Sequence, residues 1–317
     1  MNWRKLSKNF RKEIVRRGRM SQLGRTVIQT TAAIREPVDY YHRRHVAKLY
    51  NRQHPSNCMP IQEGYTLLPT GSLPGTAEVV GICRKLFSQK ESVIQSMLSN
   101  PAKPHHRSHE RKGSFLRDLL TDEDLLEFPK LLDFALAHPL LSIITNYLGT
   151  IPNLNRIDLV YSIARPTEKE HISSQLFHQD PEGLTQAKVF MNIFDVDKEN
   201  GPFMFIPASD SERIVAAIRQ QRRKQRLPNK SRYQDEEVNE HGGHKALVQL
   251  AGPAGTTVVT DTSRCLHAGS RIKPGHFRLL LFLQYCTSHE KAQSFPSERF
   301  RSDSVRWLTL RRHSATR

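Results

Sequence analysis

Cysteine is scarce in this chain of 317 residues: Cys58, Cys83, Cys265 and Cys286 form no Cys-x-x-Cys pair. This spacing excludes a disulfide framework and a zinc finger, and it favours a reducing compartment. A run of about 18 apolar residues is also lacking, so no transmembrane helix is expected. The first residues hold no apolar segment of the kind that a secretory signal requires, so we expect no such signal.

Acidic residues are few at both ends of the chain, whose formal net charge is +17. Residues 1–50 hold thirteen Lys and Arg against Glu13, Glu36 and Asp39, a net charge of +10. Residues 298–317 hold six Arg against two acidic residues, a net charge of +4. The middle of the chain is nearer neutrality, so the basic character concerns the partners of the ends rather than the core.

Residues 2–17 place Trp3, Leu6, Phe10 and Ile14 at helical spacing among Lys and Arg, which predicts a basic amphipathic helix. Such a helix binds an anionic membrane surface, docks on its own domain, or belongs to a leader for organellar import. We expect a cytoplasmic protein, with peripheral membrane attachment and organellar import left open. Nucleic acid is an unfavoured partner, because no basic pattern interleaved with aromatics is present.

Helical patterns dominate the first half of the chain, and short strand patterns dominate the second. The predicted helices are residues 75–87, a helix capped by Thr121 with a kink at Pro129, and residues 138–149. The predicted strands are residues 63–69, 156–164, 187–194, 203–206, 246–250, 256–261 and 277–285. This order predicts an α+β domain with a mainly β core, built as a sandwich or barrel.

Three segments follow from these patterns. Residues 1–56 form a basic N-terminal extension, residues 57–290 the main domain, and residues 291–317 a basic C-terminal tail. Within the domain, residues 211–244 read as an insertion that could act as a lid. The insertion carries a basic cluster of Arg219, Arg222, Arg223 and Lys224. This cluster either attracts an anionic substrate or forms a solvated helix face.

The polar motif FHQD stands at residues 177–180. In a strand, residues i and i+2 point to the same face, so His178 and Asp180 would project together. A third ligand is available if the strand 256–261 runs on to His267. Two imidazoles and one carboxylate on one side of an octahedral metal leave three open positions, which is the arrangement of non-haem Fe(II) sites.

Arg278 follows His267 by eleven residues. If residues 268–276 form the turn between two antiparallel strands, its guanidinium returns near the metal and can grip a carboxylate through two charge-assisted hydrogen bonds. A dicarboxylate with one end on the iron and the other on Arg278 fits this arrangement. The pattern therefore predicts 2-oxoglutarate as a co-substrate, together with O2.

Taken together, these motifs resemble the phytanoyl-CoA dioxygenase family of Fe(II)/2-oxoglutarate oxygenases, across about residues 60–286. The resemblance rests on HPLLSIITNYLGTIPNL, FHQD, VFMNIFDVDKENGPFMFIPAS, AGTTVVTDTSRCLHAGS and Arg278. It implies a double-stranded β-helix, or cupin-like jelly roll, with helices packed on its major sheet. It also implies that His178, Asp180 and His267 hold Fe(II) and that Arg278 holds 2-oxoglutarate.

Two details bear on the reaction that the resemblance implies. Where the family often has Gly-Ser-His, this chain has Ala208-Ser209-Asp210, so no role of that histidine is carried over. Relatives that halogenate lack the carboxylate ligand. Because Asp180 is present, the resemblance favours hydroxylation over halogenation.

Further contacts with the co-substrate are expected around this centre. Residues 187–194 alternate between an aliphatic face and a mixed face. The mixed face consists of Lys188, Phe190, Asn192 and Phe194, and the aliphatic face of Val189, Met191 and Ile193. The mixed face should line the cavity, which makes Lys188 and Asn192 candidates for binding 2-oxoglutarate, although Lys188 could instead extend to solvent. Gln175 resembles a family position near the co-substrate, and Ser270 is a candidate for holding its carboxylate.

The sequence thus predicts a hydroxylase acting on an unactivated C–H bond of a small substrate, which is anionic or carrier-linked if the basic insertion binds it. Two alternatives stay open. One is a cupin-like metal protein that acts as a hydrolase, an isomerase or a binding module without O2. The other is a membrane-surface or nucleic-acid-associated protein whose binding is driven by the basic ends.

Overall fold

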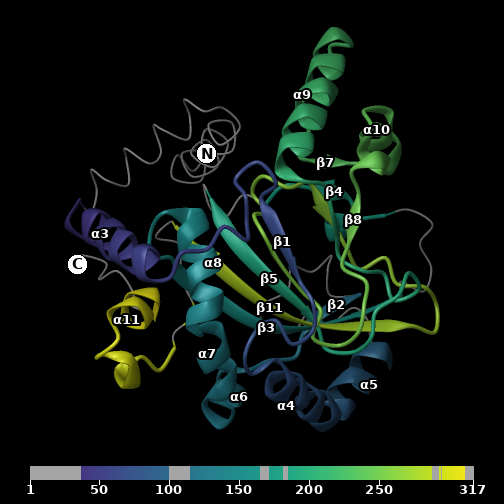
Figure 1. The fold of residues 1–317 in the computed structure, drawn as a ribbon. Helices are drawn as coiled ribbons and strands as arrows, with labels where there is room; N and C mark the ends of the chain where they lie inside the picture. The colour runs from purple at the N-terminus through teal and green to yellow at the C-terminus, as the bar shows by residue number, and fades with distance from the viewer. Residues whose placement is uncertain are drawn as a thin grey trace, which may run out of the picture.

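The computed structural model describes residues 37–99, 115–164, 171–180, 185–287, 293 and 295–310. The predicted helix at residues 2–17 and the basic residues 311–317 lie outside this part of the chain. Two antiparallel sheets form the centre of the molecule, and a layer of helices packs on the larger sheet (Figure 1).

The larger sheet has six strands in the order β1-β9-β5-β11-β3-β2. The strands are β1 (Tyr65–Leu68), β9 (Thr257–Thr260), β5 (Gln186–Asn192), β11 (Phe277–Cys286), β3 (Asn153–Ile163) and β2 (Leu116–Asp118). Aliphatic and aromatic side chains dominate β11, which lies between β5 and β3 and pairs antiparallel with both. A central strand buried on both faces is expected to carry such a sequence.

The smaller sheet has the order β7-β4-β10-β6-β8. Its strands are β7 (Arg232–Tyr233), β4 (Phe177–His178), β10 (His267–Ala268), β6 (Met204–Phe205) and β8 (Val248–Gln249). From β3 to β6 the chain crosses to the other sheet at every step, and it does so again from β9 to β11. This alternation defines a double-stranded β-helix, so the predicted jelly-roll class is confirmed.

Alternation along β5 separates the helix-facing core from the space between the sheets. Val189, Met191 and Ile193 belong to the large core that the helices cover, as predicted. Phe190 packs instead with side chains between the sheets. The prediction that Phe194 faces the cavity is wrong: it lies beyond the end of β5 and packs beside Phe87 of the helical layer, with ring centroids 5.7 Å apart.

Seven helices cover or flank the larger sheet among the described residues. They are α3 (Pro37–Gln53), α4 (Thr76–Gln89), α5 (Glu91–Ser99), α6 (Asp122–Glu127), α7 (Lys130–Ala135), α8 (His138–Leu148) and α11 (Ser304–Leu310). Thr121 caps α6 in a capping box with Asp124, as its sequence position predicts. Pro129 separates α6 from α7 instead of kinking one helix, because proline removes a hydrogen-bond donor.

Parts of both predicted terminal segments pack on the domain. The Arg43 side chain of α3 donates hydrogen bonds to the carbonyls of Ile151 and Pro152, each at 3.3 Å. Asp303 directly precedes α11, and its Oδ2 lies 3.3 Å from Nε2 of His138 on α8. The division at residues 56 and 290 therefore stays a prediction, with residues 37–53 and 304–310 resting against the helical layer.

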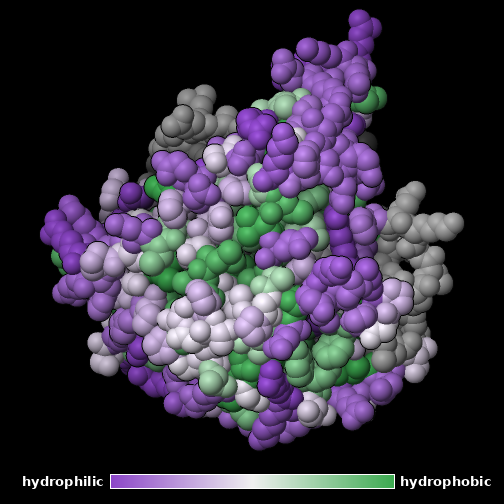
Figure 2. Space-filling model, turned by 45° about the vertical axis from the view of Figure 1, so that its right-hand side comes forward, coloured by the Kyte–Doolittle hydropathy of each residue, from purple (hydrophilic) through white to green (hydrophobic). Residues whose placement is uncertain are grey.

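The insertion forms α9 (Ala208–Lys224) and α10 (Asp235–Glu240) beside the smaller sheet. Ile214, Val215 and Ile218 are buried at the base of α9, as predicted. Its far end projects from the molecule (Figure 1), and hydrophilic side chains cover this projection (Figure 2). Among the described residues, no helix combines the length and the hydrophobicity needed to cross a bilayer.

Candidate metal centre

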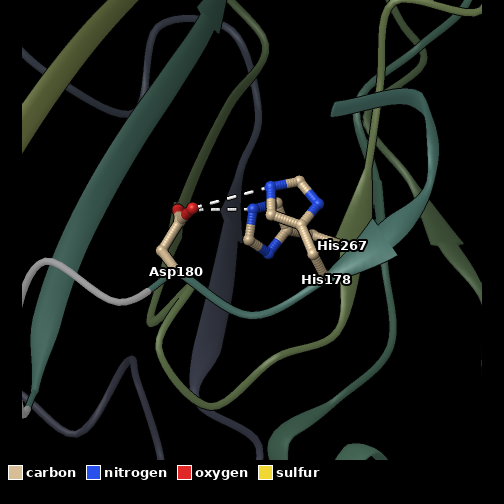
Figure 3. A group of neighbouring side chains, drawn as sticks. All are labelled: His178, Asp180 and His267. Carbon is tan, nitrogen blue, oxygen red and sulfur yellow. Dashed lines mark ion pairs between the residues drawn. The ribbon is translucent and has the colours of Figure 1, made fainter. Parts of the chain in front are cut away.

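Three side chains of ligand type meet between the two sheets. His178 ends β4 and His267 begins β10, and the two histidines are direct partners across these strands. Nε2 of His267 lies 3.3 Å from Oδ2 of Asp180, and Nε2 of His178 lies 3.6 Å from Oδ1. One ligand atom from each residue lies within 4.8 Å of the others, and Figure 3 shows both imidazoles facing the carboxylate. The fold therefore brings the predicted triad together.

Hydrogen bonds on the far side of each imidazole determine which nitrogen faces the centre. Nδ1 of His178 is 2.9 Å from the carbonyl oxygen of Leu176, and Nδ1 of His267 is 3.1 Å from that of Cys265. A carbonyl oxygen only accepts, so each Nδ1 carries the proton and each Nε2 presents its lone pair toward Asp180. Histidine ligands of metals are held in this way.

One turn, residues 261–266, supports the ligands. The carbonyl of Thr262 accepts a hydrogen bond from the backbone N–H of Asp180 at 2.8 Å. The carbonyl of Arg264 accepts one from the side-chain amide of Gln179 at 2.5 Å. The same turn supplies the carbonyl that holds the second histidine. The segments that carry the carboxylate and this histidine are thus bonded to one another.

Two local predictions about the ligands are wrong. Asp180 is not on the strand of His178, because β4 ends at His178. The N–H of Asp180 donates to the turn 261–266 rather than to a strand partner. His267 does not continue β9 but begins β10 in the other sheet. Asp261 explains this change of sheet, since its carboxylate accepts hydrogen bonds from the N–H and the hydroxyl of Ser263 at 3.0 and 2.5 Å and closes a turn.

The pKa values of the centre favour the forms that bind a metal. Burial lowers the pKa of His178 well below its usual value, and the neighbouring His267 lowers it further, so the ring is neutral near pH 7. Burial alone would raise the pKa of Asp180. The positive charge of Lys188 is the largest opposing contribution, and the pKa of this carboxyl lies well below its usual value. Neutral imidazole and ionised carboxylate are the protonation states of ligands.

Arg278 is buried between the sheets, and no carboxylate of the described residues pairs with it. Its side chain donates hydrogen bonds to Ser270 Oγ at 3.1 Å and to the carbonyl of Gly201. Its Nε has no hydrogen-bond partner, and no carboxylate of the described residues forms an ion pair with it. Burial lowers the pKa of Arg278 to about 9, which leaves the guanidinium charged near neutral pH. A buried cation without compensation is costly, so this position suits an anionic ligand.

The chain between His267 and Arg278 does not form the predicted hairpin. β10 and β11 lie in different sheets, so residues 268–276 connect the sheets and do not form a hairpin. The guanidinium still lies beside the chain just after His267. A Cβ added to Gly269 would stand 3.5 Å from Nη2 of Arg278, an ordinary van der Waals contact, which places this residue directly beside the guanidinium.

Ser270 and Gln175 belong to one hydrogen-bonded group next to Arg278. The Ser270 hydroxyl lies 3.1 Å from the hydroxyl of Ser162 on β3 and 3.1 Å from Nη2 of Arg278. The side-chain amide of Gln175 donates to the carbonyl of Ser270 at 2.9 Å. Ser270 thus stands where it can reach a ligand of the guanidinium, whereas Gln175 supports the backbone of Ser270.

Lys188 and Asn192 occupy different ends of the inner face of β5. Nζ of Lys188 lies 2.5 Å from Oδ2 of Asp180, directly at the metal centre, so the alternative of a solvent-exposed side chain does not hold. Asn192 is paired across the sheet with Leu280, two residues beyond Arg278. Its Nδ2 donates to the carbonyl of Leu250 at 3.3 Å, and its buried Oδ1 has no hydrogen-bond partner within the described segments. The Oδ1 atom of Asn192 can therefore accept a hydrogen bond from a ligand bound near Arg278.

A network that sequence reasoning missed anchors the turn 261–266. The hydroxyl of Tyr147 on α8 donates to Oδ2 of Asp261 at 2.8 Å. Arg264 forms an ion pair with Glu212 of α9 at 3.0 Å and donates to the carbonyl of Ile61 at 2.5 Å. These partners are far apart in the sequence, so no local pattern indicates them. They join the ligand-bearing turn to the helical layer and to the insertion.

An acidic pair lies further along the inner face of the larger sheet. Burial, followed by the charge of Asp158 and a hydrogen bond to it, raises the pKa of Asp118 to about 8. Oδ1 of Asp118 accepts hydrogen bonds from the N–H groups of Leu120 and Leu159, each at 3.1 Å. Arg156 forms an ion pair with Oδ2 of Asp158. Asp118 is therefore the protonated member of the pair at neutral pH.

Replacing Asp118 with asparagine is expected to flatten the dependence of stability on pH. The folded-state pKa is raised, so the wild type loses stability as pH rises from about 4, where the unfolded carboxyl ionises, to about 8. Asparagine keeps the acceptor and a donor without this titration. Thermal melting at pH 4 and pH 8.5 should give equal midpoints at the lower pH and a midpoint several degrees higher for the variant at the upper pH. Parallel profiles would contradict the assignment.

No family model and no curated protein match the chain. Among solved structures, it is similar to the epimerase SnoN in complex with Fe3+, alpha ketoglutarate and nogalamycin RO, at 15% identity over 75% of this chain and 84% of that chain, with a TM-score of 0.44. It is similar to EctD from S. alaskensis with 2-oxoglutarate and 5-hydroxyectoine, at 16% identity over 79% and 80%, with a TM-score of 0.44. It is also similar to HygX from Streptomyces hygroscopicus with nickel and 2-oxoglutarate bound, at 15% identity over 74% and 87%, with a TM-score of 0.43.

Proposed function

We propose that this chain is an Fe(II)- and 2-oxoglutarate-dependent dioxygenase that hydroxylates an unactivated C–H bond of a small organic substrate. The observation that carries the proposal is the presence, between the same two sheets, of a His-Asp-His set and a buried guanidinium that has no carboxylate partner in the described part of the chain. A metal alone accounts for the first feature but leaves Arg278 uncompensated. A chelating dicarboxylate accounts for both, since one end completes the coordination of the metal and the other neutralises Arg278.

The residues fit the iron that this function requires. His178 and His267 offer Nε2 lone pairs, and Asp180 offers an ionised carboxylate, so two nitrogens and one oxygen face one point. Three protein ligands leave three positions for co-substrate and O2. When bound, Fe(II) would activate O2, which is the oxidant, and 2-oxoglutarate would supply two of the four electrons that O2 accepts, with one oxygen atom entering the substrate and the other entering succinate as CO2 leaves.

The chain's own contribution is orientation and the exclusion of water. Arg278 and the Ser270 hydroxyl would hold the distal carboxylate, which fixes how the other end meets the metal. Phe190 and Phe203 stack with ring centroids 4.0 Å apart, and Phe203 lies 5.7 Å from the ring of His267. Aromatic side chains on this side of the centre exclude water and strengthen the charged contacts.

The finer assignments are part of the same proposal. The sequence motifs support a place in the phytanoyl-CoA dioxygenase-like group, and the basic end of α9 supports an anionic or carrier-linked substrate. Arg222 pairs with Glu237 at 3.5 Å and serves the insertion itself, whereas Arg223 and Lys224 are exposed and available to such a substrate. Membrane binding by residues 2–17 stays a proposal, since that segment lies outside the described residues.

Succinate formation tests the function. Protein supplied with Fe(II), 2-oxoglutarate and O2 should release succinate, and the rate should rise when the substrate is present in a panel of free acids, CoA thioesters and phosphorylated metabolites. The control reaction omits Fe(II) and contains a chelator. Succinate release that never exceeds this control, with or without the panel, would contradict the proposal.

A further inference from the structure

The side chain of Lys188 contacts Asp180, one of the three candidate metal ligands. Its Nζ lies 2.5 Å from Oδ2 of Asp180, and the two side chains are only 9% and 12% exposed. The Phe282 ring packs alongside, with its centroid 5.4 Å from Nζ. The pair therefore lies in the apolar interior beside the metal centre, where the contact is little screened by solvent.

Stability alone is a weak reason for such a contact. Removing two charges from water costs several kcal/mol per ion, and the attraction between the two buried charges often only offsets this cost. An apolar side chain at residue 188 would pack against Phe282 without this cost. The contact is better explained by what it does to the carboxylate of Asp180.

The two oxygens of Asp180 have different surroundings. Each oxygen faces one imidazole, Oδ2 at 3.3 Å from Nε2 of His267 and Oδ1 at 3.6 Å from Nε2 of His178, but Oδ2 also lies 2.5 Å from Nζ of Lys188. A carboxylate free at both oxygens can bind a metal through one or both of them. With Oδ2 held by an ammonium group, one oxygen is left for the metal.

We propose that Lys188 is a positioning residue that keeps Asp180 a one-oxygen ligand, so that three positions on the metal stay open. This role rests on the proposed function, in which a chelating co-substrate takes two of these positions and O2 the third. Two-oxygen binding by Asp180 would take one of them. Lys188 therefore favours co-substrate binding and at the same time weakens metal binding through its positive charge.

Replacing Lys188 with methionine separates this role from a merely structural one. Methionine has a similar volume but neither charge nor donor, so Asp180 is freed at both oxygens. We expect the variant to bind Co(II), used as a redox-stable probe, about tenfold more tightly than wild type, and the metal-loaded variant to bind 2-oxoglutarate about tenfold more weakly. Loss of a purely structural contact would weaken metal binding instead.

Replacing Lys188 with glutamine is the matched control. Glutamine lacks the charge but keeps an N–H donor for Oδ2, so Co(II) should bind more tightly while 2-oxoglutarate affinity stays within about threefold of wild type. This variant also serves if methionine prevents folding. Titration of each protein first with Co(II), then with 2-oxoglutarate, gives both constants without turnover.

The outcomes separate the two proposals. A wild type that binds Co(II) and 2-oxoglutarate, with Co(II) affinity of the methionine or glutamine variant unchanged or reduced, overturns only the role of Lys188. A wild type that binds no metal overturns the proposed function and this role with it. Tighter metal binding in both variants, with weaker 2-oxoglutarate binding in the methionine variant alone, is the expected pattern.

Discussion

Replacing Asp180 with alanine is expected to abolish metal binding and, with it, the turnover of 2-oxoglutarate. The substitution removes the only anionic ligand of the triad within the described residues, and it leaves Lys188 charged and buried beside two imidazoles. Loss of even an indirect partner of a metal ligand costs about 10- to 100-fold in affinity, so loss of this ligand should cost at least about 100-fold. Anaerobic titration with Fe(II) and a succinate assay measure the two effects.

Two further variants keep this prediction independent of folding. His267→Ala removes a ligand without leaving Lys188 uncompensated, and it should lose metal binding to a similar degree. His244→Ala removes an exposed histidine outside the centre, and it should behave as wild type. Succinate formation at the wild-type rate by both the Asp180 and the His267 variants would exclude this triad as the catalytic metal site.

Replacing Arg278 with methionine is expected to destroy 2-oxoglutarate binding while leaving the metal in place. The guanidinium has no carboxylate partner among the described residues, and in the proposed function 2-oxoglutarate would compensate its charge. Loss of a two-point, charge-assisted contact in a buried site should raise the KM for 2-oxoglutarate about 100-fold, or by about 2.8 kcal/mol. Fe(II) affinity should stay at the wild-type level, because Arg278 touches no ligand.

Thermal stability offers a second readout for the same variant. Burial of an uncompensated cation opposes folding, so the ligand-free Arg278→Met protein should melt at or above the wild-type temperature. Saturating 2-oxoglutarate with a divalent metal should raise the melting temperature of wild type but not that of the variant. Arg223→Met on the exposed surface of α9 is the control, and it should keep the full response. A variant stabilised by 2-oxoglutarate as strongly as wild type would remove Arg278 from the co-substrate site.

The strands and the pair of His178 and Asp180 were visible in the sequence because both depend on local patterns. Residues 187–194 alternate in polarity, and the structure places Val189, Met191 and Ile193 against the helices as that alternation predicts. His178 and Asp180 are two residues apart, so they stay close whether or not a strand continues through them. The α+β class with a mainly β core followed from the order of helical and strand patterns, whereas the jelly roll was implied by the family resemblance.

The sheet crossings were not visible, because contacts distant in sequence determine them. The turn at Asp261 depends on Ser263 within the turn and on Tyr147, more than a hundred residues earlier. This turn places His267 in the smaller sheet rather than at the end of β9. Phe194 was misplaced for a related reason: strand periodicity does not reveal where a strand ends.

The charged partners of individual side chains could not be predicted from the sequence either. Lys188 reads as a candidate for co-substrate binding, but only the structure shows its Nζ on Asp180. No sequence pattern singles out Asp118, whose pKa is raised to about 8 by burial and by the approach of Asp158. Both cases depend on how two separate segments of the chain pack together, which neither segment encodes alone.

The most direct test of the account is an anaerobic visible spectrum of the protein with Fe(II) and 2-oxoglutarate. A weak charge-transfer band arises only when the co-substrate chelates an iron that keeps open positions. We predict this band for wild type, its loss when either component is omitted, and its absence from the Asp180→Ala variant. A wild-type protein that shows no band at saturating Fe(II) and 2-oxoglutarate would contradict the proposed site.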